Sequence, residues 1–121
     1  MAKKILLIED DLKVSSSLNE LLRTTYEVTV ADHGKTGLEY AKKNQPDLVV
    51  LDVKLPDMMG TDVLHQLTSD PTTENIPVIV LTNLDDQHTV SSIIAAGGRE
   101  YLVKTDWSLQ EVVNKISEMV R

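Results

Sequence analysis

The chain has 121 residues, close to the usual size of one domain, so it can bury one sizeable core. Its net charge of −7 disfavours sequence-independent binding to nucleic acid, because an acidic surface repels phosphate backbones. Without cysteine, disulfides, thiolate catalysis and cysteine-based zinc sites are excluded. The first apolar stretch ends at Ile8, too short for a signal peptide, and no run reaches the ~18–20 residues that cross a membrane. We therefore expect a soluble cytoplasmic protein.

Five short apolar runs follow one another along the chain. They comprise residues 5–8, 28–30, 48–51, 78–81 and 101–103. Most of these runs are nearly continuous and rich in β-branched residues, which is typical of strands buried on both faces. The sequence therefore predicts five strands, most of them buried on both faces of a sheet.

Stretches with the apolar spacing of helices lie between and after these runs. In the first, Leu12, Leu18, Leu21 and Leu22 are predicted to share one face. The later stretches contain Leu38 and Ala41; Val63, Leu64 and Leu67; Val90, Ile93, Ile94 and Ala95, before Gly97 and Gly98; and Leu109, Val112, Val113, Ile116, Met119 and Val120. The last stretch is preceded by Ser108, which together with Glu111 predicts a capping box.

The alternation of strand and helix determines the predicted fold class. Alternating βα units form a parallel sheet with helices on both faces, and the right-handedness of the crossovers leaves few possible topologies. We therefore predict an α/β protein with a doubly wound, five-stranded parallel sheet. In such folds ligands bind at the carboxyl ends of the strands.

Polar residues follow directly on four of the predicted strands. Glu9 and Asp10 follow the first, Asp52 the third, Thr82 the fourth and Lys104 the fifth. Clustered carboxylates need a cation to remain ionised together, and Mg²⁺ prefers oxygen ligands. A carboxylate can also attack a phosphoryl group, while a lysine and a hydroxyl can stabilise the phosphoryl oxygens. The set therefore predicts a Mg²⁺-dependent site for phosphoryl transfer.

Each of these residues also has a purely structural interpretation. The alternatives are a helix cap for Thr82, a turn residue for Asp52, and solvated charges for Glu9, Asp10 and Lys104. For Asp11 the helix cap is the predicted role. Taken singly each residue indicates little, but their occurrence at successive strand ends favours a common site.

These residues and their surroundings resemble response-regulator receiver domains over the whole chain, residues 1–121. The segments that carry the resemblance are 5–11, 47–52, 55–60, 80–82 and 101–104. The resemblance implies a flavodoxin-like fold with strand order 2-1-3-4-5. It also implies a phosphoacceptor that promotes its own phosphorylation and dephosphorylation and is not a conventional enzyme.

The resemblance assigns a role to each residue of the predicted site. Asp52 is the expected phosphoacceptor. Asp10 is the expected direct Mg²⁺ ligand, Glu9 acts through water, and the backbone carbonyl of Lys54 completes the set. Lys104 is expected to pair with the phosphoryl group.

The resemblance also implies a switch and partners. Thr82 is expected to move towards the phosphoryl group and Tyr101 to turn inward, which alters a face that binds an unknown downstream protein. The alternative for Tyr101 is an edge-strand aromatic without a switch role. The expected donor is a histidine kinase or phosphotransfer protein, and the expected state a monomer or weak dimer. The end of the chain, soon after the last helix, favours a stand-alone receiver.

Several positions depart from the family pattern. Thr105 replaces the usual proline after Lys104. The sequence therefore leaves both the cis and the trans form open for the peptide bond between these two residues. Asn83 replaces a small residue, while Lys54 and Leu84 occupy positions that tune the phosphoryl lifetime. These departures leave open a degenerate receiver that binds partners without phosphorylation.

Two further functions are disfavoured by single positions. Phosphohydrolases with an aspartate nucleophile carry a second aspartate where this chain has Lys54. The first βα turn has no glycine, so neither a dinucleotide-binding nor a P-loop motif is present there. None of His33, His65 and His88 lies at a predicted strand end, so we expect all three on the surface.

Overall fold

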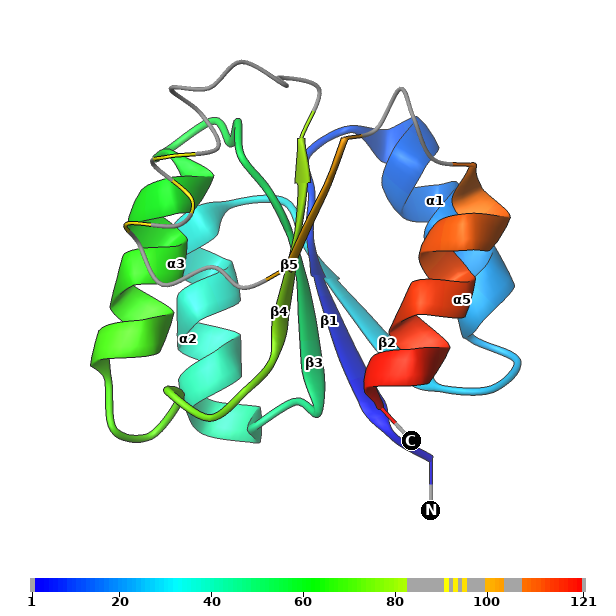
Figure 1. The fold of residues 1–121 in the computed structure, drawn as a ribbon, viewed down its shortest axis with the longest axis horizontal. Helices are drawn as coiled ribbons and strands as arrows, with labels where there is room; N and C mark the ends of the chain where they lie inside the picture. Colours follow the sequence, from blue (N-terminus) through cyan, green and yellow to red (C-terminus); the bar gives the residue numbers. More distant parts are fainter. Residues whose placement is uncertain are drawn as a thin grey trace.

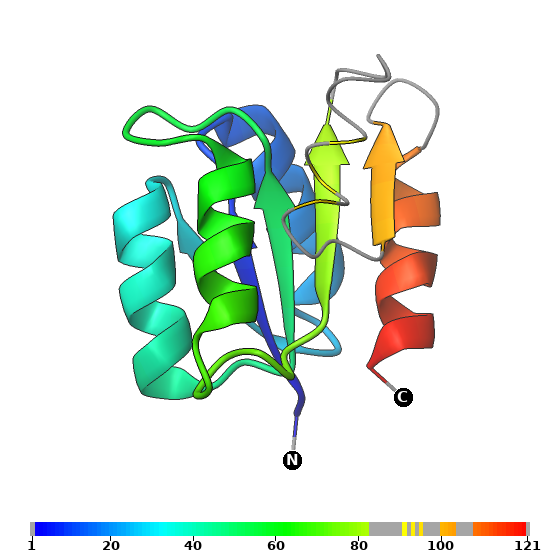
Figure 2. The same ribbon diagram turned by 60° about the vertical axis from the view of Figure 1, so that its left-hand side comes forward.

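The computed structural model describes residues 2–82, 91, 93, 95, 100–103 and 108–120, with backbone alone for 82 and 100–103. One sheet contains five strands: β1 (Lys4–Ile8), β2 (Glu27–Ala31), β3 (Leu48–Asp52), β4 (Val78–Thr82) and β5 (Glu100–Val103). The neighbouring strands are parallel, and their order is β2-β1-β3-β4-β5 (Figures 1 and 2). The α/β class with a parallel sheet, predicted from the alternation, is therefore confirmed.

Helices cover both faces of this sheet. They are α1 (Leu12–Leu22), α2 (Gly34–Asn44), α3 (Gly60–Ser69) and α5 (Leu109–Met119). Figure 1 shows α2 and α3 together on one face and α1 and α5 on the other. Residues 91, 93 and 95 are also helical, and Ile93 is buried, while the rest of the stretch predicted there lies outside the described residues.

Strand β1 illustrates why the strand sequences are continuously apolar. Leu6 and Ile8 belong to the core beneath α2 and α3, whereas Ile5 and Leu7 belong to the core beneath α1 and α5. Successive side chains of a strand point to opposite faces, so a strand covered on both faces must be apolar at every position. All four side chains are at most 1% exposed.

The predicted apolar face of α1 is only partly correct. Leu18 and Leu22 are buried with Ser15 at helical spacing, but Leu12 is 76% exposed and Leu21 42% exposed. Leu12 is the first residue of the helix and follows the end of β1 by only four positions. At about 100° per residue, Leu12 and Leu21 lie on opposite sides of the arc formed by Ser15, Leu18 and Leu22, so they flank the buried face.

The helix caps agree with the predictions. The Asp11 carboxylate accepts a hydrogen bond from the backbone N–H of Lys13 at 2.9 Å. Ser108 and Glu111 form the predicted capping box at the start of α5, each side chain accepting from the other residue's backbone N–H. Both caps satisfy N–H groups that have no partner within their own helix.

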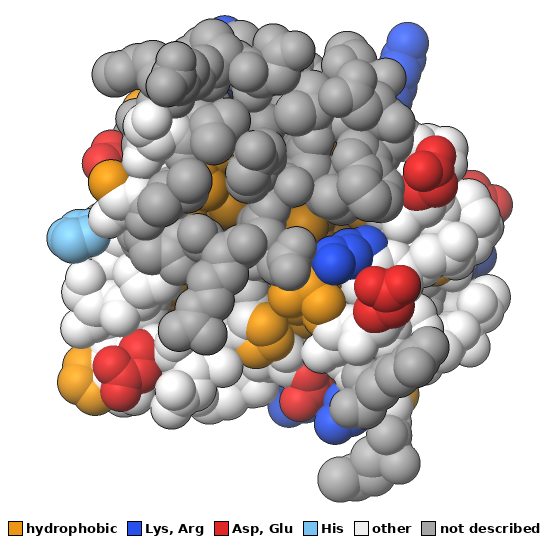
Figure 3. All heavy atoms as spheres, in the orientation of Figure 1, with side chains coloured by type: hydrophobic (Ala, Val, Ile, Leu, Met, Phe, Trp, Pro, Cys, Tyr) orange, Lys and Arg blue, Asp and Glu red, His pale blue; other side chains and the backbone are white. Residues whose placement is uncertain are grey.

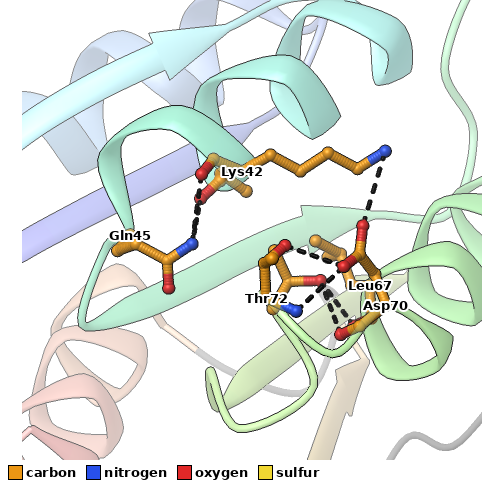
Figure 4. A network of polar contacts seen from close by, with 7 residues as sticks. Lys42, Gln45, Leu67, Asp70 and Thr72 are labelled. Carbon is orange, nitrogen blue, oxygen red and sulfur yellow. Dashed lines mark hydrogen bonds and ion pairs between the residues drawn. The ribbon is translucent and has the colours of Figure 1, made fainter.

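A polar network closes the amino edge of the sheet, between α2 and the loop after α3 (Figure 4). Asp70 accepts hydrogen bonds from the backbone N–H of Thr72 at 2.9 Å and from its hydroxyl at 2.7 Å. Lys42 of α2 pairs with the same carboxylate at 3.6 Å. These contacts fix the predicted loop of residues 69–77 at the end of the molecule opposite the carboxyl edge.

The surface of the described residues carries mixed charge. On the face drawn in Figure 3, acidic and basic side chains are interspersed and form no extended patch of one sign among the coloured atoms. Among the described residues, no helix combines the length and the apolar character needed to cross a bilayer.

Candidate functional site

Three carboxylates meet where β1 and β3 end. Ile8 and Leu51 are register partners in these neighbouring strands, so Glu9 and Asp52 are next to each other at the carboxyl edge. Asp10 follows Glu9. One carboxylate oxygen from each of Glu9, Asp10 and Asp52 lies within 4.8 Å of the other two. The structure thus brings Asp52 next to Glu9 and Asp10, although Glu9 and Asp52 are 43 positions apart in the sequence.

The three acids differ in their exposure. Glu9 is 4% exposed and Asp52 8% exposed, whereas Asp10 is on the surface. The backbone N–H of Glu9 donates to the carbonyl of Ala31 at 3.0 Å, and its side chain accepts from the N–H of Asp11 at 3.2 Å. These bonds fix Glu9 between β2 and the start of α1. Two buried carboxylates beside a third acid form an all-oxygen donor set, which suits a hard divalent cation such as Mg²⁺.

The loop between β3 and α3 begins one residue after Asp52 and is closed at its base. Lys54 and Met59 form an isolated antiparallel bridge. The associated hydrogen bond runs from the N–H of Gly60 to the carbonyl of Val53, so this bond does not use the carbonyl of Lys54. The Lys54 side chain is exposed. The proposed carbonyl ligand, on Lys54, therefore lies two positions after Asp52, in the part of the loop that this bridge holds together.

Gly60, the first residue of α3, packs directly on the backbone of β3. A Cβ atom at this position would collide with the carbonyl oxygen of Asp52 and would lie 2.7 Å from the Cα of Val53. The close approach of the α3 and β3 backbones therefore requires glycine at position 60, the last residue of the segment 55–60.

Asp57, which sequence reasoning gave no role, joins the same loop to α2. Its carboxylate accepts hydrogen bonds from the backbone N–H groups of Gly34 at 2.8 Å and Lys35 at 3.0 Å. His33 precedes α2 but makes no capping bond with its side chain. The bonds from Lys35 and Gly34 lower the pKa of Asp57. No local motif could reveal this cap, because its partners are 22 and 23 positions away.

An Asp–His pair lies between β2 and α2, next to this cap. Nδ1 of His33 is 2.7 Å from Oδ1 of Asp32. This bond raises the pKa of His33, and the charges of Asp32, Asp57 and Asp10 raise it further. The same bond lowers the pKa of Asp32. His33 and His65 are exposed as predicted, and His88 lies outside the described residues.

The remaining predicted site residues are on β4 and β5 or after them. Thr82 is the last residue of β4 and follows Leu81, the register partner of Asp52, while Tyr101 pairs with Val80. The side chains of both residues lie outside the described part of the chain. Also outside it are Asn83, Leu84, Lys104 and Thr105, with the peptide bond between the last two.

Comparison with known proteins identifies the family. Residues 5–117 match the family described as response regulator receiver domain. The chain is 35% identical over 118 residues to the probable transcriptional regulatory protein TcrX of Mycobacterium tuberculosis, covering 97% of this chain and 49% of that protein. It therefore belongs to the response regulator receiver domains, the signalling domains of two-component systems.

Solved structures agree with this assignment. A CheY-like receiver domain protein from Methanospirillum hungatei JF-1 superimposes with a TM-score of 0.90 at 26% identity, covering 99% of this chain and 94% of that one. The phosphorylated cyanobacterial phytochrome response regulator RcpA superimposes with a TM-score of 0.88 at 28% identity, covering 99% and 94%. The chain spans about half or less of the length of curated relatives such as TcrX and PleD of Caulobacter vibrioides.

Proposed function

We propose that this receiver domain accepts a phosphoryl group on Asp52 in a reaction that depends on Mg²⁺. The observation that carries the proposal is the convergence of Glu9, Asp10 and Asp52, whose carboxylate oxygens lie within 4.8 Å of one another at the carboxyl edge. Receiver domains generally bind Mg²⁺ at an acidic pocket, and two of these three acids are buried. A cation bound between these oxygens would relieve the repulsion among like charges at this distance.

In the proposed reaction an Asp52 carboxylate oxygen attacks phosphorus and forms an acyl phosphate. The bond that breaks joins phosphorus to an imidazole nitrogen of the donor, and that nitrogen retains the electron pair. Asp10, Glu9, Asp52 and the Lys54 carbonyl would hold Mg²⁺, which when bound neutralises negative charge on the carboxylates and the transferred group. Water would later hydrolyse the acyl phosphate slowly at the same site, releasing inorganic phosphate.

The other predicted residues complete the proposal. Lys104 would pair with the phosphoryl oxygens, and Thr82 would hydrogen-bond them. Tyr101 would then change orientation and alter the face that a downstream protein binds. Physically this is a local charge event that biases a two-state element.

The proposed donor is a histidine kinase or a phosphotransfer protein bearing phosphohistidine. Two relatives of this chain are named as histidine kinases, the hybrid signal transduction histidine kinase D of Dictyostelium discoideum and histidine kinase P4 of Formosa agariphila. We propose that the exchange takes place in the cytoplasm, with the domain as a monomer or weak dimer.

A phosphorylation-independent binding module is the second candidate. Thr105 in place of the usual proline and Asn83 in place of a small residue favour it, because both positions adjoin residues proposed to contact the phosphoryl group. The presence of all three acids with Thr82 and Lys104 favours phosphorylation.

Intact-protein mass after incubation with a small phosphodonor tests the proposal. We expect one added phosphoryl group that requires both Mg²⁺ and Asp52, and no added mass on Asp52→Asn, whose fold should be intact by circular dichroism. Beryllofluoride with Mg²⁺, followed by amide NMR, provides a donor-independent readout. If the wild-type protein shows no added mass and no spectral change, the phosphoacceptor proposal is wrong. The second candidate, a phosphorylation-independent binding module, then takes its place.

A further inference from the structure

We propose that Asp57 is a positioning residue for metal binding, because it ties the tip of the β3–α3 loop to the first turn of α2. This inference rests on the proposed function, since it concerns the same Mg²⁺ site. Asp57 does not belong to the cluster of Glu9, Asp10 and Asp52. Its effect would be transmitted through the backbone of the loop that carries Lys54.

The base and the tip of this loop are held by different contacts. At the base, Lys54 faces Met59 in an antiparallel bridge, and the N–H of Gly60 donates to Val53. At the tip, both carboxylate oxygens of Asp57 are engaged, Oδ1 by the N–H of Gly34 and Oδ2 by the N–H of Lys35. The tip contacts therefore fix the part of the loop that the base contacts leave unattached.

The helix that receives this tether is itself packed tightly against the loop. A Cβ atom at Gly34 would lie 2.5 Å from Cγ and 2.7 Å from Sδ of Met58, and 2.9 Å from a methyl group of Val63. Met58 adjoins Asp57, and Val63 is buried in α3. The small residue at the start of α2 thus lets the loop approach closely enough for the two hydrogen bonds.

The same helix is also packed against the strand that supplies the other ligands. A Cβ atom at Gly37 would lie 2.5 Å from Cδ1 of Ile8, the last residue of β1. Ile8 immediately precedes Glu9 and Asp10. Helix α2 therefore contacts β1 just before two of the proposed ligands and, through Asp57, the loop that carries the Lys54 carbonyl. The tether fixes the distance between these two sources of ligands.

Asp57 can also act through its charge alone. An anion near the site favours a cation through space, and this effect does not depend on hydrogen bonds. Two substitutions separate the two mechanisms. Asp57→Asn removes the charge but keeps a short side chain with one acceptor oxygen, whereas Asp57→Glu keeps the charge but displaces both oxygens by one methylene.

The test is Mg²⁺ affinity measured by calorimetry on the 121-residue chain, with wild type, Asp57→Ala, Asp57→Asn and Asp57→Glu. Asp70→Ala is the matched control, because Asp70 also accepts a backbone N–H in a loop and contacts α2, but at the opposite edge. Groups that orient metal ligands typically change affinity 10- to 100-fold when removed, so we expect about tenfold weaker binding for Asp57→Ala. Asp57→Glu should resemble Asp57→Ala, Asp57→Asn should be weakened less, and Asp70→Ala should bind as wild type.

Thermal unfolding without Mg²⁺ separates positioning from stability, since both Asp57→Ala and Asp70→Ala remove a loop contact and both should lower the midpoint. If Asp57→Ala does not fold, the comparison between Asp57→Asn and Asp57→Glu carries the test. Unchanged affinity in Asp57→Ala, or weak binding by Asp57→Asn with normal binding by Asp57→Glu, would overturn the tether while leaving the proposed function intact. No Mg²⁺ binding by wild type would remove the proposed function and this inference together.

Discussion

Gly60 lies against the backbone carbonyl of Asp52, so the first residue of α3 and the proposed phosphoacceptor are in direct backbone contact. We predict that Gly60→Ala destabilises the domain by roughly 1–3 kcal/mol or more, because the obstructing atoms are backbone atoms of Asp52 and Val53 and cannot turn aside as a side chain can. Urea unfolding measures this loss.

Gly34→Ala is the control for this prediction. The nearest atoms that its Cβ would meet belong to the side chain of Met58, which has several rotatable bonds and is only partly buried. We expect a smaller loss of stability than for Gly60→Ala. Equal losses at the two positions would contradict the distinction between backbone and side-chain obstruction.

Leu7 and Leu12 provide a matched test of the two-faced sheet. Leu7 is fully buried under α1 and α5, whereas Leu12 is 76% exposed. Leu7→Ala should lower the free energy of unfolding by roughly 2–5 kcal/mol, and Leu12→Ala should change it by no more than about 0.5 kcal/mol. The comparison uses urea unfolding. A large effect at Leu12 would show that this side chain contributes to the core, as its grouping with Leu18 and Leu22 in the sequence had predicted.

The example of Leu12 shows what the sequence does and does not predict. The alternation of apolar runs and helical stretches determined the α/β class correctly, because burying a parallel sheet on both faces leaves a strong pattern. Caps such as Asp11 and Ser108 were also predictable, since their partners are within three positions. The exposure of Leu12 was not, because the buried face of α1 includes the polar residue Ser15, which an apolar pattern does not mark.

The residues of the site also fall into those that the sequence predicted and one that it did not. Glu9, Asp10 and Asp52 were found because parallel strands bring their carboxyl ends to one edge, so position after a strand predicts proximity. Asp57 was not assigned a role, since its hydrogen bonds to Gly34 and Lys35 join segments separated by a strand and a helix. Local motifs cannot identify a tertiary cap of this kind.

The pair formed by Asp32 and His33 predicts a pH dependence of stability. The pKa of His33 is raised, so its contribution is complete below the unfolded value of about 6.5 and is lost as pH rises through the folded value. The pKa of Asp32 is lowered, so its contribution is complete above about 3.9 and is lost as pH falls through the folded value. Both contributions are therefore present between about pH 3.9 and 6.5.

His33→Gln tests this window. The difference in unfolding free energy between wild type and variant, measured by urea without Mg²⁺ at a series of pH values, should be largest inside the window and decrease towards alkaline pH. Asp57 is present in both proteins, so its own titration cancels to first order. The pair is exposed, and 1 M salt should reduce the difference. A difference that is independent of pH would mean that the charges of the pair contribute nothing to stability.

Asp10 and Asp11 are adjacent acids that the structure places in different roles. An Asp10 oxygen belongs to the three-carboxylate cluster, whereas the Asp11 carboxylate caps α1. Asp10→Asn should weaken Mg²⁺ binding by at least about tenfold, the lower end of the loss seen when groups that merely orient ligands are removed. Asp11→Asn removes the same charge but keeps a good cap, so its affinity should be close to that of wild type. Calorimetric titration with Mg²⁺ compares the two.

The metal-free proteins give the complementary result. Asp10→Asn relieves repulsion within a cluster in which Glu9 and Asp52 are already buried, so its stability without Mg²⁺ should be equal to or higher than that of wild type. Stabilisation by added Mg²⁺ should be smaller in this variant, because a ligand stabilises a fold only to the extent that it binds. If the two variants responded alike to Mg²⁺, the effect would be one of net charge and Asp10 would not be a ligand.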